Sequence, residues 1–417
     1  MKPRTVVFTL FALALLALAT PPASAQFTFD LLHTFTGYPT DGNFPTGGVI
    51  QDADGNLYGT TVIGGTGCVP AGCGTVFKID KNGQYTVLYR FLAGNDGSGP
   101  VAGLARDAAG TLYGTTQGRF GVSTVFKVDN HGTETVLFRF TNYKDGGAAN
   151  STPVLDAEGN LYATAPVGGD VKCNNNGYNN GCGVVFRLSN SGAFKVLHTF
   201  TSLPSGAQPN GNLVMDGSGN LYGTTVIGGD LSCPSFYHTG CGTVFEISKN
   251  GKFTVLYRFH GKADGSTPAS VVGDSAGNLY GIADAGGVVC SNNFFRGCGT
   301  IFKIDNAGKF SVLYKFDPKS PGLMFTFNNL VRDSKGNLYG TNQFGGTAND
   351  GYLFELDAKG KFSVLYNFPG YFSGDGNQPT GAIMARNGDF YGTLANGGDQ
   401  GCGNQDEGCG TVFKLTH

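Results

Sequence analysis

The sequence predicts an all-β protein, a seven-bladed β-propeller with four-stranded antiparallel blades. Three observations predict this fold: a motif close to Gly-Asn-Leu-Tyr-Gly recurs seven times, its copies lie 49 to 60 residues apart, and the chain holds 69 glycines among many Phe and Tyr residues. A period of this length is too long for a β-helix coil or a helical-pair repeat, but it fits one blade with generous loops. The tyrosines of the seven copies are Tyr58, Tyr113, Tyr162, Tyr222, Tyr280, Tyr339 and Tyr391.

The second copy shows how one repeat divides into strands. We predict strands over residues 101–107, 111–116, 123–129 and 134–140, named a, b, c and d in chain order. Each is short and rich in Val, Leu, Phe, Tyr and Thr. Strands c and d carry bulky residues on both faces, which is typical of sheets that are covered on both sides, as blades in a ring are.

The two ends of the chain predict how the ring closes. Residues 29–35 resemble strand d of another copy, 194–200, whereas the C-terminal strand, 410–415, corresponds to a strand c. We therefore expect the N-terminal strand d to pair with the C-terminal strands a to c and to complete the seventh blade.

The Asp-x-x-Gly turn between strands a and b has two interpretations. As a structural turn, its aspartate caps the turn and its glycine takes the left-handed conformation. As a calcium loop, the run from Asp52 to Asn56 would supply carboxylates from Asp52 and Asp54. The other copies lack the second carboxylate and no bidentate glutamate follows, which favours the structural turn.

The N-terminus has the pattern of a secretory signal peptide. Lys2 and Arg4 precede an apolar run over residues 6–19, and the small residues 23–25 follow. The pattern predicts a signal peptide over residues 1–25 and a single propeller domain over residues 26–417. The apolar run is shorter than the roughly 20 residues of a membrane anchor. We expect a secreted, extracellular protein with no membrane span after cleavage.

Composition argues against two classes of partner. The formal net charge is −2 and only 14% of the residues are charged, so there is neither a basic stripe for nucleic acid nor a polybasic patch for anionic lipid. We expect no contact with nucleic acid or membrane, and we expect a monomer.

Ten cysteines fall into five pairs, and each pair lies within one b–c loop. The two remaining copies have no cysteine in this loop, so copies keep both cysteines or lose both. This pattern predicts five local disulfides in an oxidising compartment. Zinc binding and redox catalysis are the alternatives, but regularly placed histidines and Cys-x-x-Cys motifs are absent. The expected pairs are Cys68–Cys73, Cys173–Cys182, Cys233–Cys241, Cys290–Cys298 and Cys402–Cys409.

The repeated motif resembles the GloVer tandem repeat. Gly-Asn-Leu-Tyr-Gly-Thr-Thr at residues 55–61 and 219–225 is followed by Gly-Cys-Gly-Thr-Val-Phe at residues 72–77 and 240–245. The resemblance covers almost the whole chain after the signal peptide. It implies a secreted or surface-displayed bacterial protein. Some members carry a C-terminal sorting anchor, which residues 414–417 do not resemble. The family has no established activity, so the resemblance implies no catalytic residue.

Strand alternation predicts that the b–c loops and the d–a connections emerge on one face, the candidate working surface. Asp-Gly pairs recur in five of the d–a connections. One hypothesis is that their aspartates form an acidic rim at the channel mouth that binds a polyhydroxylated ligand or calcium. Structural turns are the alternative, favoured because two copies lack the pair. The candidate ligand-binding residues are Asp41, Asp96, Asp145, Asp264 and Asp375.

No catalytic elbow, zinc-protease motif or phosphate loop occurs, so we expect no cofactor, with calcium the one ion left open. We interpret the protein as a non-catalytic binding module or scaffold for an extracellular polysaccharide or a cell-surface protein. Loops rich in Asn and aromatic residues at 174–180, 235–238 and 291–295 favour a glycan. The alternative is a carbohydrate-active enzyme, a glycoside hydrolase or lyase, with carboxylates contributed by several blades.

Overall fold

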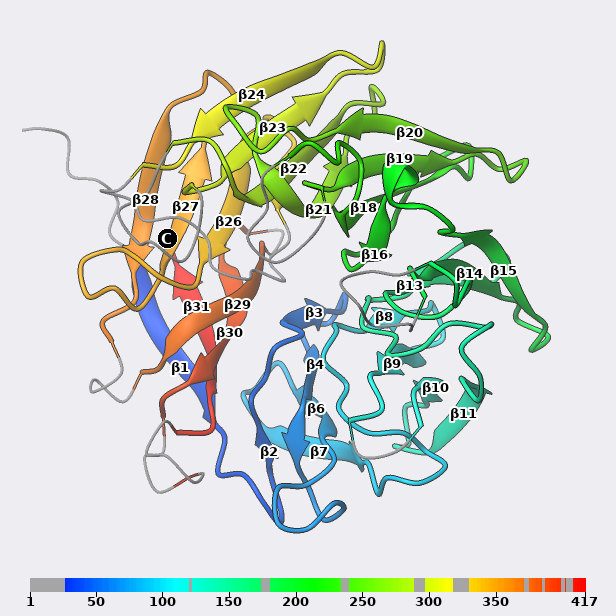
Figure 1. Ribbon diagram of the computed structural model, residues 1–417. Coiled ribbons are helices and arrows are strands. Elements are labelled where there is room, and N and C mark those ends of the chain that lie inside the picture. Colours follow the sequence, from blue (N-terminus) through cyan, green and yellow to red (C-terminus); the bar gives the residue numbers. More distant parts are fainter. Residues whose placement is uncertain are drawn as a thin grey trace, which may run out of the picture.

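The chain folds into a ring of seven antiparallel sheets, the seven-bladed β-propeller predicted from the repeats (Figure 1). The computed structural model describes residues 27–119, 122–173, 181–233, 240–288, 297–317, 330–370, 375–384, 387–398, 402 and 408–417. The predicted signal peptide at residues 1–25 lies outside this range. In each blade strand a lies nearest the centre of the ring and strand d at its rim (Figure 1).

The first four blades follow each other along the chain. Blade one consists of β3 (Val49–Gln51), β4 (Leu57–Thr61), β6 (Thr75–Ile79) and β7 (Tyr85–Arg90). Blade two consists of β8 (Ala105–Arg106), β9 (Leu112–Thr116), β10 (Thr124–Val128) and β11 (Glu134–Arg139). Blade three consists of β12 (Val154–Leu155), β13 (Leu161–Ala165), β14 (Val184–Leu188) and β15 (Phe194–Thr199). Blade four consists of β16 (Ala207–Pro209) and β17 (Val214–Met215), which both pair with β18 (Leu221–Ile227), then β19 (Thr243–Ile247) and β20 (Phe253–Arg258).

Three further blades complete the ring. Blade five consists of β21 (Ser266–Gly273), β22 (Leu279–Ala285), β23 (Thr300–Ile304) and β24 (Phe310–Lys315). Blade six consists of β25 (Val331–Arg332), β26 (Leu338–Asn342), β27 (Tyr352–Leu356) and β28 (Phe362–Asn367). Blade seven consists of β29 (Asn377–Met384), β30 (Phe390–Asn396), β31 (Thr411–Thr416) and β1 (Thr28–Thr34). A short ribbon pairs β2 (Gly42–Asn43) with β5 (Ile63–Gly64), and η1 (Leu203–Ser205) is a single turn of 3₁₀ helix.

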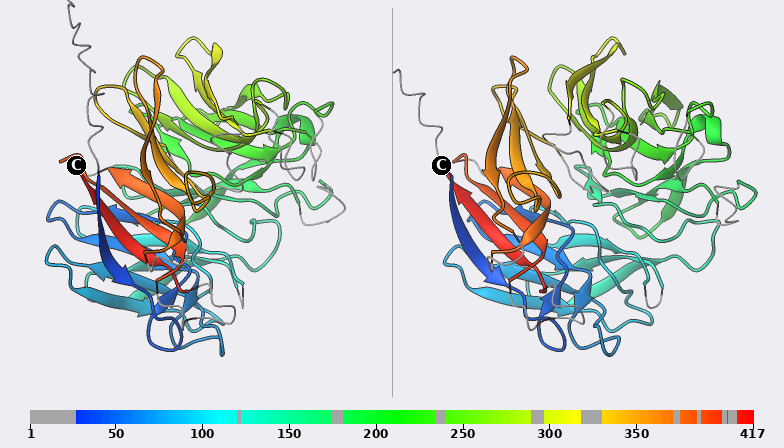
Figure 2. Two further views of the ribbon diagram at one scale, coloured as in Figure 1. Left: turned by 90° about the vertical axis from the view of Figure 1, so that its left-hand side faces the viewer. Right: turned by 60° about the vertical axis from the view of Figure 1, so that its left-hand side comes forward.

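Blade seven closes the ring by pairing the two ends of the chain. Strand β1 lies antiparallel to β31, with Thr28 opposite Thr416 and Thr34 opposite Thr411. In Figures 1 and 2 the blue N-terminal strand lies beside the red C-terminal strand. The predicted closure is therefore confirmed.

Strand a of blade two is much shorter than predicted. The sequence predicts residues 101–107, but only Ala105 and Arg106 pair with β9. The carbonyl groups of Val101 and Ala102 instead accept hydrogen bonds from the hydroxyl groups of two threonines of blade one, at 2.9 Å each. The segment before β8 is thus held by the neighbouring blade rather than by its own sheet.

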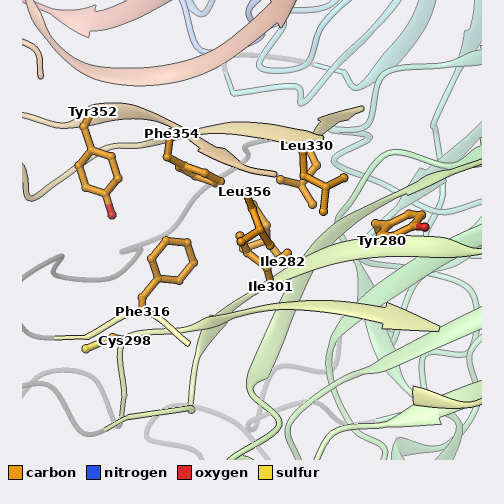
Figure 3. Packing of buried hydrophobic residues seen from close by; sticks show 10 residues of the cluster. Tyr280, Ile282, Cys298, Ile301, Phe316, Leu330, Tyr352, Phe354 and Leu356 are labelled. Carbon is orange, nitrogen blue, oxygen red and sulfur yellow. The ribbon is translucent and has the colours of Figure 1, made fainter. Parts of the chain in front are cut away.

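The hydrophobic core lies between neighbouring blades. Figure 3 shows the cluster between blades five and six, where Phe316 and Ile301 from blade five face Phe354 and Tyr352 from blade six. All four side chains are fully buried. Because each blade buries both faces against its neighbours, the interior residues do not alternate between apolar and polar along a strand.

At the rim, rings from neighbouring outer strands stack on each other. A ring near the end of one strand d lies almost parallel to a ring at the start of the next strand d. Six of the seven junctions contain such a pair, and only the junction of blades one and two, where Tyr89 meets Glu134, does not. The centroid distances are 3.5 Å for His33–Tyr85, 3.9 Å for Phe138–Phe194, 3.7 Å for His198–Phe253, 3.7 Å for Tyr257–Phe310, 4.3 Å for Tyr314–Phe362 and 5.7 Å for Phe29–Tyr366.

The glycines around each cysteine pair close the base of the b–c loop. In blade one, Gly64 and Gly72 form a parallel bridge, and the amide of Gly74 donates to the carbonyl of Gly64 at 3.0 Å. Gly72 has a φ of 82°, and a Cβ atom there would collide with the Gly64 backbone. The equivalent bridges of other blades are Gly228–Gly240, Gly286–Gly297 and Gly397–Gly408.

Candidate binding face

The b–c loops and d–a connections emerge on one side of the ring, which we call the loop face. The tight a–b and c–d turns form the opposite side, the turn face. Hydrogen bonds join the two kinds of loop directly. The amide of Gly65 in a b–c loop donates to the carbonyl of Asp41 in a d–a connection at 2.8 Å, and Gly229 donates to Leu203 at 2.8 Å. Equivalent bonds join Gly169 to Tyr143 and Gly287 to Lys262, so the two kinds of loop are connected in blades one, three, four and five.

Exposed apolar side chains gather on the loop face. Among the described residues eleven large hydrophobic side chains are exposed, and eight of them lie in loops of this face. The other three lie on outer strands, and none lies in a turn of the turn face. The turns of that face instead expose charged residues such as Lys81, Glu158 and Lys249. The eight are Tyr38, Phe44, Leu92 and Tyr143 in d–a connections and Val69, Val171, Leu231 and Val288 in b–c loops.

Disulfides hold the b–c loops of this face. Four of the predicted pairs are formed within the described residues, with Cα atoms 5.2 to 5.8 Å apart. In the fifth pair, Cys290 lies outside the described residues. Gly261, which follows strand d of blade four, packs directly against the sulfur atoms of its disulfide, and a Cβ atom there would clash with them. The disulfide therefore supports the adjoining d–a connection as well as its own loop. The four formed pairs are Cys68–Cys73, Cys173–Cys182, Cys233–Cys241 and Cys402–Cys409.

Asp41, the first predicted ligand-binding aspartate, lies between two outer strands. Its Oδ1 accepts hydrogen bonds from the Tyr85 hydroxyl at 2.5 Å and the Gly42 amide at 2.7 Å. Its Oδ2 accepts from the Thr36 amide at 3.0 Å and lies 3.1 Å from His33 Nε2. Burial would raise the pKa of Asp41, but these hydrogen bonds, led by that of His33, hold it below its ordinary value. Asp41 is 7% exposed, and its carboxylate oxygens make hydrogen bonds within the protein.

Asp96 and Asp264 make the same kind of contact in other blades. The hydroxyl of Tyr89 donates to Asp96 Oδ2 at 2.8 Å, and the hydroxyl of Tyr257 donates to Asp264 Oδ2 at 2.9 Å. Each tyrosine occupies the strand d position that His33 occupies beside Asp41. The Asp-Gly aspartate thus serves as the acceptor for a polar ring on the preceding outer strand.

Asp145 and Asp375 differ from these three. The strand d residue that precedes Asp145 is Phe138, which has no polar atom to donate, and the Asp145 carboxylate accepts a hydrogen bond from Asn142 Nδ2 at 2.8 Å. Burial raises the pKa of Asp375 above its ordinary value. The five aspartates lie in five separate connections. Ligand binding by them stays a prediction.

The turn face explains the tyrosine of the repeat motif. In blade one, Asp52 Oδ2 accepts hydrogen bonds from Asn56 Nδ2 at 2.9 Å and from the Tyr58 hydroxyl at 3.0 Å. Asn56 Oδ1 in turn accepts from the Lys81 amide in the c–d turn at 3.1 Å. Burial would raise the pKa of Asp52, but the bonds from Asn56 and Tyr58 and the charge of Arg106 lower it. The sequence predicts the turn but not the role of the tyrosine, although its constant spacing from the aspartate was a signal.

Within the described residues, His, Cys, Asp and Glu side chains nowhere gather in threes as a metal site would require. Calcium binding therefore stays a prediction. A search of the same residues for helices long and apolar enough to cross a membrane returned none.

Comparison with known proteins places these observations in a family. The extracellular domain of a hybrid two-component system from B. thetaiotaomicron superposes with a TM-score of 0.54 at 12% identity, over 93% of this chain and 41% of the other. The chain thus spans about two fifths of that domain, and the likeness shows the fold alone. A gluconolactonase from Xanthomonas campestris superposes with a TM-score of 0.44 at 12% identity, over 94% of this chain and 90% of the other. TolB from Acinetobacter baumannii gives 0.41 at 15% identity, over 77% and 63%.

No curated protein sequence matches the chain. The family model described as the Gloeobacter/Verrucomicrobia repeat matches residues 19–177 and 172–405, which confirms the resemblance stated from the sequence. The chain belongs to the Gloeobacter/Verrucomicrobia repeat family.

Proposed function

We propose that the protein is an exported binding module that holds an extracellular polysaccharide on its loop face. The observation that carries this proposal is the distribution of exposed apolar side chains. Eight of the eleven lie in loops of one face, while the turns of the other expose charged and polar groups. Surface apolar groups that gather on one face are typical of an interaction surface.

The construction of the loops supports this role. Disulfides and glycine bridges fix the b–c loops at their bases, and these loops hydrogen-bond to the d–a connections. Loops that are ordered before binding lose less conformational entropy when a ligand arrives, which favours affinity. The disulfides also support export, because they persist in oxidising compartments.

The chemistry of the loops favours a sugar over a nucleic acid or an anionic lipid. The net charge of −2 provides no basic field for a polyanion. Exposed rings beside amide and carboxylate groups, as in the run from Asn142 to Asp145, offer a flat surface for sugar C–H groups and acceptors for sugar hydroxyls.

Retention on insoluble polysaccharides tests the proposal. Residues 26–417 are incubated with a panel of insoluble polysaccharides, with calcium or with chelator, and the fraction retained is measured. We expect retention on at least one polysaccharide. The double variant Leu92→Ala/Tyr143→Ala on the loop face should lose it, whereas Lys81→Ala/Lys249→Ala on the turn face should bind as the wild type does.

Retention by no polysaccharide would reject the glycan and leave a surface protein as the partner. Loss of retention in chelator would give calcium a part in binding, and unchanged retention would exclude it.

A further inference from the structure

Tyr143 is the most exposed aromatic side chain among the described residues. It is 54% exposed, compared with 38% for Tyr38 and 37% for Phe44. The backbone at this position is held by a hydrogen bond to another loop. The Tyr143 carbonyl accepts a hydrogen bond from the Gly169 amide at 2.5 Å, in the b–c loop of blade three.

The residues on both sides of Tyr143 hold the connection in one conformation. Asn142 Oδ1 accepts hydrogen bonds from the amides of Lys144 at 2.8 Å and Asp145 at 3.3 Å. Further along, Gly147 forms an antiparallel bridge with Val167. The ring of Tyr143 is thus presented to solvent from a clamped turn, a preorganised arrangement that suits a ligand.

Asp145 differs from the equivalent aspartates of two other connections. The Oδ2 atoms of Asp96 and Asp264 accept hydrogen bonds from Tyr89 and Tyr257, and their Oδ1 atoms are buried. Phe138, at the equivalent position before Asp145, has no hydroxyl to donate. Asp145 Oδ2 accepts the hydrogen bond from Asn142 Nδ2 at 2.8 Å. None of the described residues donates to its Oδ1. Two residues from an exposed ring, a carboxylate oxygen is therefore available to an incoming donor.

We propose that Tyr143 and Asp145, positioned by Asn142, form a subsite for a neutral hexopyranose unit of a polysaccharide. The axial C–H groups of a pyranose with equatorial hydroxyls would lie against the Tyr143 ring, and a sugar hydroxyl would donate to Asp145 Oδ1. A carboxylate offers acceptors only, so it matches a hydroxyl and opposes a uronate. This inference deepens the proposed function and rests on it.

The absence of tryptophan from the chain provides a local test. Tyr143→Trp keeps a ring at the subsite and introduces the only tryptophan of the variant, which can be excited selectively over the tyrosines. Its emission is followed during titration with the hexasaccharides of β-1,4-linked glucose, mannose and N-acetylglucosamine, and with a hexasaccharide of hyaluronan, which contains uronate. The matched control is Tyr38→Trp, the only tryptophan of its own variant, at another exposed position of the same face.

We expect a saturable change in the emission of Tyr143→Trp with at least one neutral hexasaccharide and none with Tyr38→Trp. Adding Asp145→Ala should weaken that binding at least tenfold, or about 1.4 kcal/mol. No response to any neutral hexasaccharide, or a stronger response to the hyaluronan fragment, would overturn the subsite.

The outcome is separable from that of the proposed function. If polysaccharide still retains the wild type and Tyr143→Ala equally while Tyr143→Trp gives no signal, the subsite is wrong and the binding face stands. If Tyr143→Trp responds but no insoluble polysaccharide retains the protein, the subsite stands and matrix binding fails.

Discussion

His33 and His198 occupy the same position of strand d in blades seven and three, but they meet different neighbours. Both stack on a ring of the next blade, on Tyr85 at 3.5 Å and on Phe253 at 3.7 Å. His33 also lies 3.1 Å from Asp41, whereas the connection after His198 has Ser205 in place of that aspartate. His198 Nε2 is shielded from solvent and has no hydrogen-bond partner among the described residues.

Burial lowers the pKa of His198 from 6.5 to about 4. The unfolded chain therefore binds a proton between pH 6.5 and 4 that the folded protein excludes, so stability falls as the pH decreases through this range. His198→Phe keeps the stacked pair, as Phe138–Phe194 does, and removes the titrating group. We expect the variant to gain about 1–2 kcal/mol over the wild type at pH 4.5, after allowance for partial exposure, and little at pH 7.5.

Denaturant unfolding at both pH values measures this difference. The control is His131→Gln in an exposed c–d turn, which should show no such dependence on pH. An equal effect of His198→Phe at the two pH values would mean that the imidazole is not the acid-sensitive group. His33→Phe should instead destabilise at both values, because Asp41 then loses a hydrogen bond.

The equivalent positions of the two histidines in strand d indicate that both are packing residues, and both do pack on a neighbouring ring. It does not predict the difference between them, because that difference arises from a loop residue brought close only in the folded ring. The same holds for Asp52, whose bond with Tyr58 crosses the hairpin. Local patterns predict where a side chain is buried, whereas its polar partners depend on packing.

Among the strands, β11 departs from the pattern of the rim. Six outer strands carry an aromatic residue at the stacking position, as their first or second residue, but β11 has Glu134 there. Asp96 and Tyr89 of blade one and Arg139 of the same strand influence Glu134 electrostatically. Lys127 on β10 lies opposite Thr135, the residue after Glu134. Because side chains alternate along a strand, Lys127 lies on the face of the sheet away from Glu134. Glu134 and Asp96 each have one buried carboxylate oxygen that accepts no hydrogen bond from the described residues.

Burial and the charge of Asp96 raise the pKa of Glu134 from 4.5 to about 7. The folded protein therefore keeps a proton that the unfolded chain releases above pH 4.5, and stability is lost as the pH rises from 4.5 through 7. Glu134→Phe places a ring beside Tyr89, as at the six other junctions, and removes the carboxylate. We expect its advantage over the wild type to grow by about 1–2 kcal/mol between pH 5 and pH 8.

Thermal unfolding of both proteins across that range provides the measurement. Glu158→Gln, in an exposed a–b turn, is the matched control and should follow the wild type. If the advantage of Glu134→Phe stays constant with pH, the junction does not hold a proton at neutral pH.

The strands themselves were largely predictable. In the second copy, strands b, c and d agree with the predicted ranges to within one residue at each end. Strand a of this copy was not predictable in the same way, because its Val and Leu residues reflect burial against the preceding blade rather than pairing within the sheet. No local sequence pattern predicts the ribbon of β2 and β5 or the division of the inner strand of blade four into β16 and β17. These pairings depend on contact between loops.

For the whole molecule, closure of the ring rests on one strand. Residues 27–35 supply β1, and Phe35 is fully buried with its ring 5.3 Å from that of Phe77 in blade one. Deletion of residues 27–35 removes an outer strand and exposes the edge of β31. We expect a melting temperature at least ~10 °C lower, or no cooperative transition, because a whole strand and its apolar contacts are lost.

Circular dichroism during heating measures the transition. A synthetic peptide of residues 26–36 added to the truncated protein should restore part of the loss, whereas the same peptide with Phe29, Leu31 and Phe35 replaced by Ser should not. A truncated protein that melts within a degree or two of the intact one would contradict the closure.

The fold of the whole chain was predictable because seven copies repeat the same turns and strands, so each copy supports the interpretation of the others. The proposed subsite was less predictable for the same reason. Features shared by the copies, such as Asp41 and Asp96 with their rings, belong to the common construction. The subsite that we propose lies where one copy differs, at Phe138 and Tyr143, and a single difference among repeats carries no statistical signal.

The pairing of β1 with β31 also fixes an order of events in time. A ribosome makes residues 28–34 long before it makes their partners, residues 411–416. During that whole interval the first strand has no partner of its own, and blade seven cannot form. The circle is therefore completed only after translation of the last strand. Until then β1 has no edge to pair with, and the ring of blades stays open.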